Sequence, residues 1–205
     1  HGFPLNGKLC TLVTGNTLYA ENGDDNRSHF GMEKATKAMN TTSGGAYFRD
    51  YVYGENGDPY TFKADVAEGY WYVYVYTGDK ISNHTTDFYF NDGKPAYNNN
   101  EAGVKAASRG AITPQREEDG KTIYTQAGSG GGQYLAANAI YRVYVPATTE
   151  GGDKGVFSIT CFDASKSANV TARLNGLEMA HMSYAKALEE TMNELKACSA
   201  NDFTA

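Results

Sequence analysis

The sequence GYWYVYVYTG at residues 69–78 has the alternation of a β-strand, in which successive side chains leave opposite faces. One face carries Trp71, Val73 and Val75, and this apolar set predicts contact with a core. The other face carries four phenol rings, those of Tyr70, Tyr72, Tyr74 and Tyr76. Because tyrosine joins an apolar ring to a polar hydroxyl, we expect this second face to lie between a partly buried sheet and water.

Strand-like runs lie on both sides of this segment, separated by Gly, Asn, Asp and Pro. They are rich in β-branched and aromatic residues, and their spacing is typical of a β-sandwich. The runs cover residues 9–20, 46–54, 59–66, 85–92, 133–146, 155–164 and 168–180. The sequence therefore predicts an all-β fold, a β-sandwich.

Three segments depart from the strand pattern. Met32, Ala35 and Met39 have helical spacing and predict a short amphipathic helix or turn within residues 31–39. Residues 93–132 are polar and glycine-rich, which predicts a long loop insertion. Residues 183–198 repeat apolar side chains at helical spacing and predict a C-terminal α-helix. We expect one β-sandwich domain over residues 1–181, followed by a helix and tail over 182–205 that packs back on the sandwich or leads into a neighbouring domain.

Composition excludes several classes of protein. The 205 residues include 18 Lys and Arg against 24 Asp and Glu, a net charge of −6 without any basic run, so we expect no nucleic-acid partner. No stretch approaches the ~20 apolar residues of a membrane helix, so we expect no membrane insertion. Three widely spaced cysteines rule out a disulfide scaffold, while a single bridge between Cys10 and Cys161 and free thiols both stay open.

Catalytic and metal-binding motifs are weak. The four histidines form no pair at ligand spacing, and no nucleophile motif is present, so we expect no enzyme. We expect no required cofactor. The acidic loop AENGDD places Glu21 and Asp24 where their oxygens could hold a structural Ca²⁺, although a solvated acidic turn explains the same residues equally well.

Three stretches together suggest a family: SGGAYFRDYVYG at 43–54, DPYTFKADVAEGYWYVYVYTGD at 58–79, and FSITCFDAS with ANVTARLNGLEM near the end. Their order resembles the galactose-binding-like β-sandwiches, in particular malectin-like domains and the calcium-containing carbohydrate-binding modules of bacterial polysaccharide-degrading enzymes. The resemblance covers residues 15–92 and 155–180. It implies a jelly-roll sandwich that binds carbohydrate.

The resemblance also implies individual site residues. Tyr47 or Tyr51 would match a sugar-contacting tyrosine, and Asp163 and Asp79 would match carboxylates at the same end of the sandwich. Glu21 would match a structural calcium ligand, whereas Asn175 stands where a last-strand Asp is usual. From the strand pattern and its following loop we add Arg49, Tyr76 and Lys80 as further carbohydrate-binding candidates.

The expected function is non-catalytic binding of an oligo- or polysaccharide by tyrosine stacking and polar loop residues. The resemblance favours an α-glucan such as starch or maltooligosaccharide, with plant cell-wall polysaccharide as the alternative. We expect such a module to belong to a larger multidomain bacterial protein that is secreted or on the cell surface. Two other classes stay open: a carbohydrate esterase or lyase fragment, and a protein-binding adhesion module that docks through the C-terminal helix.

Overall fold

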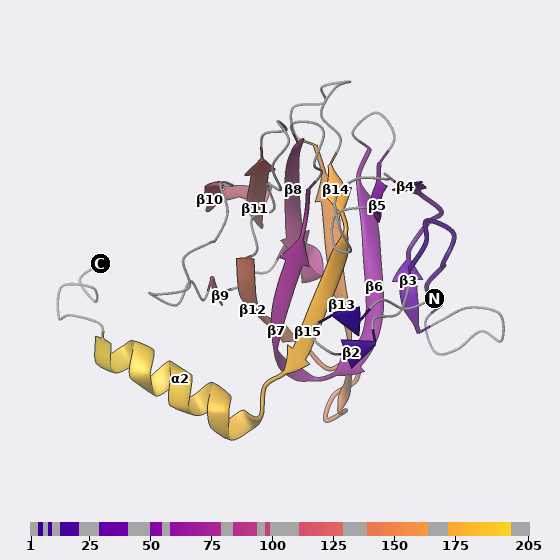
Figure 1. Ribbon diagram of the computed structural model, residues 1–205. Helices are drawn as coiled ribbons and strands as arrows, with labels where there is room; N and C mark the ends of the chain where they lie inside the picture. The colour runs from indigo at the N-terminus through magenta and orange to yellow at the C-terminus, as the bar shows by residue number, and fades with distance from the viewer. Residues whose placement is uncertain are drawn as a thin grey trace.

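The computed structural model describes residues 4–5, 8–9, 13–20, 29–40, 50–54, 58–78, 84–93, 97–98, 111–128, 139–163 and 172–197. These residues form mostly antiparallel β-strands with one α-helix (Figure 1). The larger sheet has six strands, in the order β10 (Ala111–Glu118), β11 (Lys121–Gly128), β8 (His84–Phe90), β13 (Lys154–Phe162), β6 (Tyr60–Ala67) and β3 (Phe30–Met32). The prediction of an all-β fold is confirmed.

The central aromatic segment lies in a second sheet of four strands. Its order is β15 (Gly176–His181), β7 (Gly69–Tyr76), β12 (Ala139–Val145) and β9 (Tyr97–Asn98). Smaller groups are the three-stranded sheet β14 (Arg173–Leu174), β5 (Asp50–Tyr53) and β4 (Lys37–Asn40), and the pair β1 (Pro4–Leu5) and β2 (Lys8–Leu9). A short 3-10 turn, η2 (Asn91–Gly93), follows β8.

One hydrophobic core joins the two large sheets. Val73 and Val75 of β7 are fully buried, as the alternation in this strand predicts. Tyr141 of β12 extends into the same core, where its ring centroid lies 5.5 Å from that of Phe88 and 5.0 Å from that of Tyr124 in the larger sheet. Such edge-to-face aromatic pairs stabilise a core beyond the burial of their area. The two sheets therefore pack against each other through side chains of one core. The finer assignment, a galactose-binding-like jelly-roll sandwich, stays a prediction.

Asn91 in η2 joins the two sheets with its side-chain amide. The amide nitrogen donates to the carbonyl of Tyr144 at 2.9 Å, and the amide oxygen accepts from the backbone N–H of Ser158 at 2.8 Å. Asn91 is buried and has a positive φ of 41°, a conformation that Asn tolerates better than most residues. The backbone conformation of Asn91 thus places its amide where it can bond both to β12 of the four-stranded sheet and to β13 of the larger sheet.

The predicted helix within residues 31–39 is wrong. Met32 lies in β3, which pairs with β6, and Met39 lies in β4, which pairs with β5. Of the three apolar residues that carried the helical spacing, Met32 is buried while Ala35 and Met39 are exposed, so they share no face. Backbone bonds to Thr17 and Tyr19 complete the pairing of Met32, and these partners are distant in sequence. The described part of the predicted run 9–20 contributes here through the isolated bridge between Leu18 and Met32.

The prediction of a long loop over residues 93–132 is also wrong where the structure describes it. β10 and β11 form a hairpin in this segment, and Asp119 and Gly120 make its two-residue turn, since Glu118 pairs with Lys121. Both turn residues have positive φ, 51° and 72°, which is the geometry that an Asp-Gly hairpin turn requires. The turn and the adjoining end of β10 are exposed, whereas β11 buries the side chains of Thr122, Ile123, Tyr124 and Gln126.

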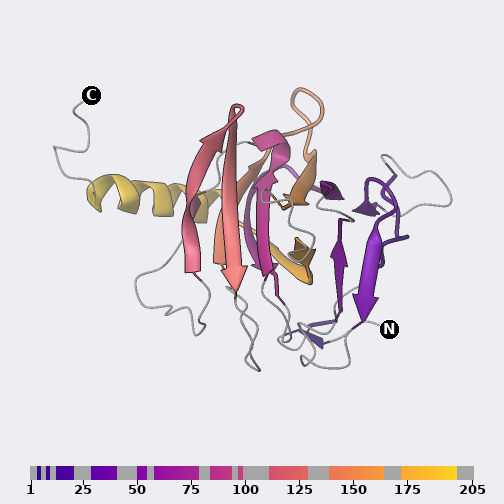
Figure 2. The ribbon, with the colours of Figure 1, turned by 90° about the horizontal axis from the view of Figure 1, so that it is seen from above.

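The predicted C-terminal helix is confirmed as α2 (Tyr184–Ala197). Ser183 begins it, with its hydroxyl accepting a hydrogen bond from the N–H of Lys186 at 3.3 Å, as an N-cap does. Figures 1 and 2 show α2 extending from the end of β15 to one side of the strands, opposite β3 and β4. Within the described residues, no helix has both the length and the apolar character needed to cross a bilayer.

Candidate functional site

The outward face of the four-stranded sheet gathers tyrosines from two strands. In the antiparallel register Tyr70 lies opposite Tyr144, and Tyr72 lies opposite Arg142. Tyr74 lies opposite Glu178 of β15. We call this surface the tyrosine face, and it consists of Tyr70, Tyr72, Tyr74, Tyr76 and Tyr144. The alternation of β7 thus places its phenol rings on the side opposite Val73 and Val75, as predicted, and β12 adds a fifth ring.

One end of the tyrosine face is open. Tyr144 has 44% of its surface exposed, and its ring lies 5.1 Å from that of Tyr70 at an angle of 55°. The Tyr144 hydroxyl donates to the carboxylate of Glu68 at 2.8 Å. A ring face beside a carboxylate offers both a stacking surface and a hydrogen-bond acceptor. This combination matches a sugar, which presents apolar C–H faces and a rim of hydroxyls.

The middle of the tyrosine face is covered by α2. Tyr72 donates its hydroxyl proton to Oε1 of Glu190 in a short hydrogen bond. The other oxygen of this carboxylate, Oε2, lies 3.7 Å from Nη1 of Arg142. From the same side of the helix, the Lys186 ammonium lies 5.0 Å from the centroid of the Tyr72 ring. The helix therefore meets the sheet through charged and polar groups.

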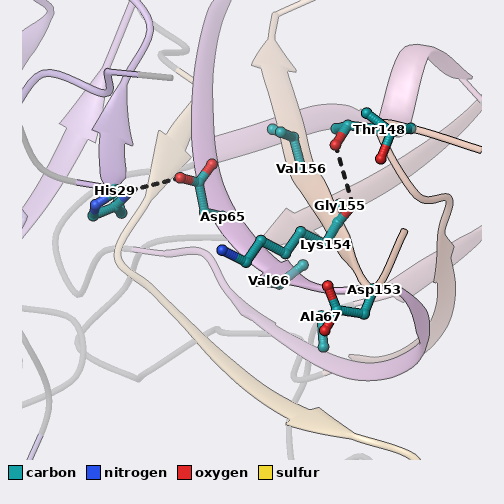
Figure 3. Close-up of a pocket in the computed structure, with 10 residues that line it drawn as sticks. His29, Asp65, Val66, Ala67, Thr148, Asp153, Lys154, Gly155 and Val156 are labelled. Carbon is teal, nitrogen blue, oxygen red and sulfur yellow. Dashed lines mark hydrogen bonds and ion pairs between the residues drawn. The ribbon is translucent and has the colours of Figure 1, made fainter. Parts of the chain in front are cut away.

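A separate cavity of about 730 Å³ lies at the end of β6 and the start of β13 in the larger sheet (Figure 3). Nδ1 of His29 lies 2.7 Å from Oδ2 of Asp65, and the Tyr19 hydroxyl donates to Oδ1 of the same carboxylate at 2.7 Å. In Figure 3 the side chain of Lys154 extends toward the side on which His29 and Asp65 lie. A carboxylate that fixes one ring nitrogen orients the imidazole, which is the arrangement of many general bases. The lining also includes Thr148, Thr149, Asp153 and the backbone of Gly155.

Three of the predicted carbohydrate-binding residues are described, and all are buried. Tyr51 is 6% exposed, donates to the sulfur of Met39, and lies under the guanidinium of Arg173 at 4.9 Å. Tyr76 is 8% exposed, and its hydroxyl lies 3.3 Å from the Glu178 carboxylate. Asp163 is 2% exposed at the end of β13. Their rings and carboxylate offer little open surface to a ligand.

Asn175 links the end of β7 to the start of β5. Its side chain accepts from the N–H of Gly78 at 2.7 Å and donates to the carbonyl of Asp50 at 3.1 Å. Asn175 thus joins the chain just after β7, which carries Tyr76, to the first residue of β5, which carries Tyr51. The remaining predicted site residues lie outside the described part of the chain; they are Tyr47, Arg49, Asp79, Lys80, Glu21 and Asp24.

The predicted calcium ligands fall in that undescribed part, so the calcium prediction stays a prediction. Among the residues that the structure describes, no cluster of three or more His, Cys, Asp or Glu is arranged to hold a metal ion. Cys161 is a buried free thiol, which answers the open question of its bridge to Cys10. Burial raises the pKa of this thiol to about 12, so it stays protonated and unreactive at neutral pH.

The sequence did not predict several functional groups of the tyrosine face and of the cavity. Arg142, Glu190, Asp65 and His29 each gain their position from a partner far along the chain, such as the 36 residues between His29 and Asp65. Tyr144 could have been found, because the alternation in IYRVYVP separates Tyr141 and Val143 from Arg142 and Tyr144. Alternation alone, however, does not indicate which of two strands lie side by side.

Comparison of the chain with models of protein families, with curated proteins and with solved structures finds no match. The resemblance to malectin-like and related domains thus stays a prediction.

Proposed function

We propose that this chain is a non-catalytic glycan-binding module that holds its ligand on the tyrosine face. The observation that carries the proposal is the open pair of Tyr144 and Tyr70 beside Glu68, on the side of the four-stranded sheet that faces away from the core. The tyrosine rings would stack on the apolar faces of sugar rings, while Glu68 would accept hydroxyl protons. The sheet holds these groups in place before binding, which lowers the entropy lost on association.

Affinity for short ligands would be modest. Each sugar hydroxyl that contacts the protein exchanges one hydrogen bond with water for another, so its net contribution is small. We expect a Kd on the order of micromolar to millimolar for a short oligosaccharide. The preference for an α-glucan comes from the resemblance alone, and the contacts of the tyrosine face do not distinguish it from plant cell-wall polysaccharide.

The test is retention of the purified chain on insoluble starch, cellulose, xylan and pectin, followed by calorimetry with the matching oligosaccharide. Tyr144→Ala should abolish retention, because it removes the exposed ring of the open pair. Tyr89→Ala is the matched control, since Tyr89 is a half-buried tyrosine on the larger sheet, with its ring centroid 6.2 Å from that of Phe162. Retention of Tyr144→Ala equal to the wild type, or retention of the wild type on none of the polysaccharides, would overturn the proposal.

A second candidate function is acid–base catalysis in the cavity, which the Tyr19, Asp65 and His29 contacts favour. His29 oriented by Asp65 would act as a general base that activates water toward an ester on a polysaccharide, in the manner of a carbohydrate esterase. The test is release of acetate from acetylated xylan. Activity that is lost in His29→Ala and in Asp65→Asn would support this function, and an inactive wild-type chain would exclude it.

A further inference from the structure

Glu190 occupies a position on the tyrosine face that is built for a carboxylate. Its two oxygens meet the hydroxyl of Tyr72 and the guanidinium of Arg142. The side chain of Arg142 is 4% exposed, whereas that of Glu190 is 24% exposed. A buried guanidinium needs an anion nearby, because desolvation of an unpaired charge is costly. Arg142 thus provides a fixed positive group on the sheet, and the helix supplies the negative group that reaches it.

Two apolar side chains of α2 that the structure describes, Leu188 and Met192, do not hold the helix on the sheet. Leu188 and Met192 are 60% and 47% exposed. Lys186 and Glu190 are one helical turn apart and share the side that meets the sheet, roughly 200° around the axis from Leu188. Because burial of apolar area supplies most of the free energy that docks a surface helix, a helix held by its polar side detaches at low cost.

We propose that Arg142 and Tyr72 form a binding site for the carboxylate of a hexuronate residue, and that Glu190 is its internal occupant. This inference rests on the proposed glycan-binding function and names the ligand class as an acidic glycan. A hexuronate carboxylate replaces that of Glu190 on Arg142, and α2 moves off the tyrosine face. Movement of α2 also removes Lys186 from the ring of Tyr72, which then becomes available for stacking.

The neighbouring groups favour a sugar acid over other carboxylates. Arg142 and Tyr144 are alternate residues of β12, so their side chains leave the same face about 7 Å apart along the strand. A hexuronate bound at Arg142 therefore places the next sugar ring near the open pair of Tyr144 and Tyr70. An acidic peptide has no flat C–H face to stack on that pair.

The occupancy of the site by Glu190 lowers the apparent affinity for an external ligand. A ligand that binds only when α2 has moved has an apparent Kd equal to its intrinsic Kd divided by the fraction of molecules in which Glu190 has left the site. Glu190→Gln keeps the size of the side chain and removes the charge that faces Arg142, so it should raise that fraction. Glu189→Gln is the matched control, because Glu189 is exposed on the same helix and changes the net charge equally.

The experiment is calorimetry of the full chain with a short galacturonate oligomer, its neutral galactose counterpart and a glutamate oligomer of equal charge. We expect Glu190→Gln to bind the galacturonate oligomer about tenfold more tightly than the wild type does. Its affinity for the neutral oligomer should not change, and Glu189→Gln should resemble the wild type. Hydrogen exchange of the α2 backbone should become faster when galacturonate is added.

Arg142→Gln should remove the preference for the galacturonate oligomer over the neutral one. If this variant does not fold, Arg142→Lys serves instead, because it keeps the charge but loses the planar fork that pairs with a carboxylate. Binding of the neutral oligomer with no preference for galacturonate in Glu190→Gln would overturn this inference and leave the proposed function standing. Equal binding of the glutamate oligomer would overturn the hexuronate assignment, and absence of binding to every glycan would overturn both proposals.

Discussion

Two tyrosines of β12, Tyr141 and Tyr144, lie three residues apart and have opposite surroundings. Tyr141 is 0% exposed and contacts the rings of Phe88, Phe90 and Tyr124 in the other sheet. Tyr144 is 44% exposed and contacts Tyr70 on its own sheet and Glu68 in the turn between β6 and β7. Because an odd separation along a strand reverses the face, position within the strand decides which tyrosine stabilises the fold and which is available to a ligand.

The inner tyrosine should carry the largest effect on stability. Tyr141→Ala leaves a cavity among aromatic rings and removes the partner of the Gln126 amide, which lies 3.4 Å from the Tyr141 hydroxyl. We expect a loss of about 3–5 kcal/mol in the free energy of unfolding, measured by urea denaturation. A loss below about 1 kcal/mol would mean that the core does not depend on Tyr141, and would break the comparison with Tyr144.

The second-largest expected effect is that high pH lowers the free energy of unfolding, through two buried acidic groups of the core. Burial raises the pKa of Cys161 to about 12, and burial followed by the charge of Cys161 raises the pKa of Tyr60 well above its usual value. Both groups are therefore held neutral in the folded state. The stability that they contribute is complete below the unfolded pKa of the thiol, near pH 9, and falls as pH rises toward 12.

Thermal unfolding at a series of pH values checks this expectation. The melting temperature should fall steeply between pH 9 and 12 in the wild type, and less steeply in Cys161→Ala, which lacks one of the buried acids. Equal slopes in the two proteins would show that Cys161 contributes nothing to alkaline unfolding.

Asp87 of the larger sheet extends the comparison. Its side chain leaves β8 on the side opposite the core residues Phe88 and Phe90, yet it is buried, unlike Tyr144. Asp87 is 4% exposed and accepts hydrogen bonds from Thr125 and, at 3.1 Å, from Nη2 of Arg116. The hydrogen bond to Asp87 is the first cause that raises the pKa of Arg116. We expect Asp87→Asn to lower the free energy of unfolding by about 1–3 kcal/mol in urea denaturation.

Glu118→Gln is the control for that variant. Glu118 contacts Nε of the same Arg116 at 3.1 Å, but its side chain is 56% exposed. Exposed ion pairs contribute little, so this change should cost less than about 1 kcal/mol. If the two variants lose equal stability, burial of Asp87 does not account for the difference.

The outer tyrosine should have the smallest effect on stability. Tyr144→Ala removes an exposed ring and one hydrogen bond to Glu68, and we expect a change of about 0.5 kcal/mol in the free energy of unfolding. Chemical denaturation of Tyr144→Ala beside Tyr141→Ala measures the contrast directly. A loss as large as that of Tyr141→Ala would show that Tyr144 is structural, and any effect on glycan retention would then have another explanation.

Local patterns predicted the parts of the fold that depend on one strand or one helix. The alternation in residues 69–76 identified both the core side and the tyrosine side of β7, and helical spacing identified α2. The Asp119–Gly120 pair was a usable signal for the β10–β11 hairpin, but the polar composition of residues 93–132 obscured it. The polar composition suggested exposure, yet the polar side chains of Thr122 and Gln126 in β11 are buried.

The candidate sites were harder to predict because they join distant segments. Glu190 reaches Tyr72 across 118 residues, and nothing in the local sequence of either residue indicates the pairing. The same holds for the helix, since its apolar stripe suggested a docking side, whereas the structure presents Glu190 to the sheet and leaves Leu188 and Met192 exposed. Contacts of this kind depend on the order of strands in a sheet, which the residue pattern of a single strand does not encode.

The outermost strand of the larger sheet, β10, contains Pro114 at an irregularity in its register between Thr113 and Arg116. Proline has no N–H to offer, and a bulge bends a strand away from a straight partner. A second copy of the chain that approaches this edge therefore finds an interrupted row of hydrogen-bond groups. This edge of the larger sheet is in this way protected against the addition of another strand.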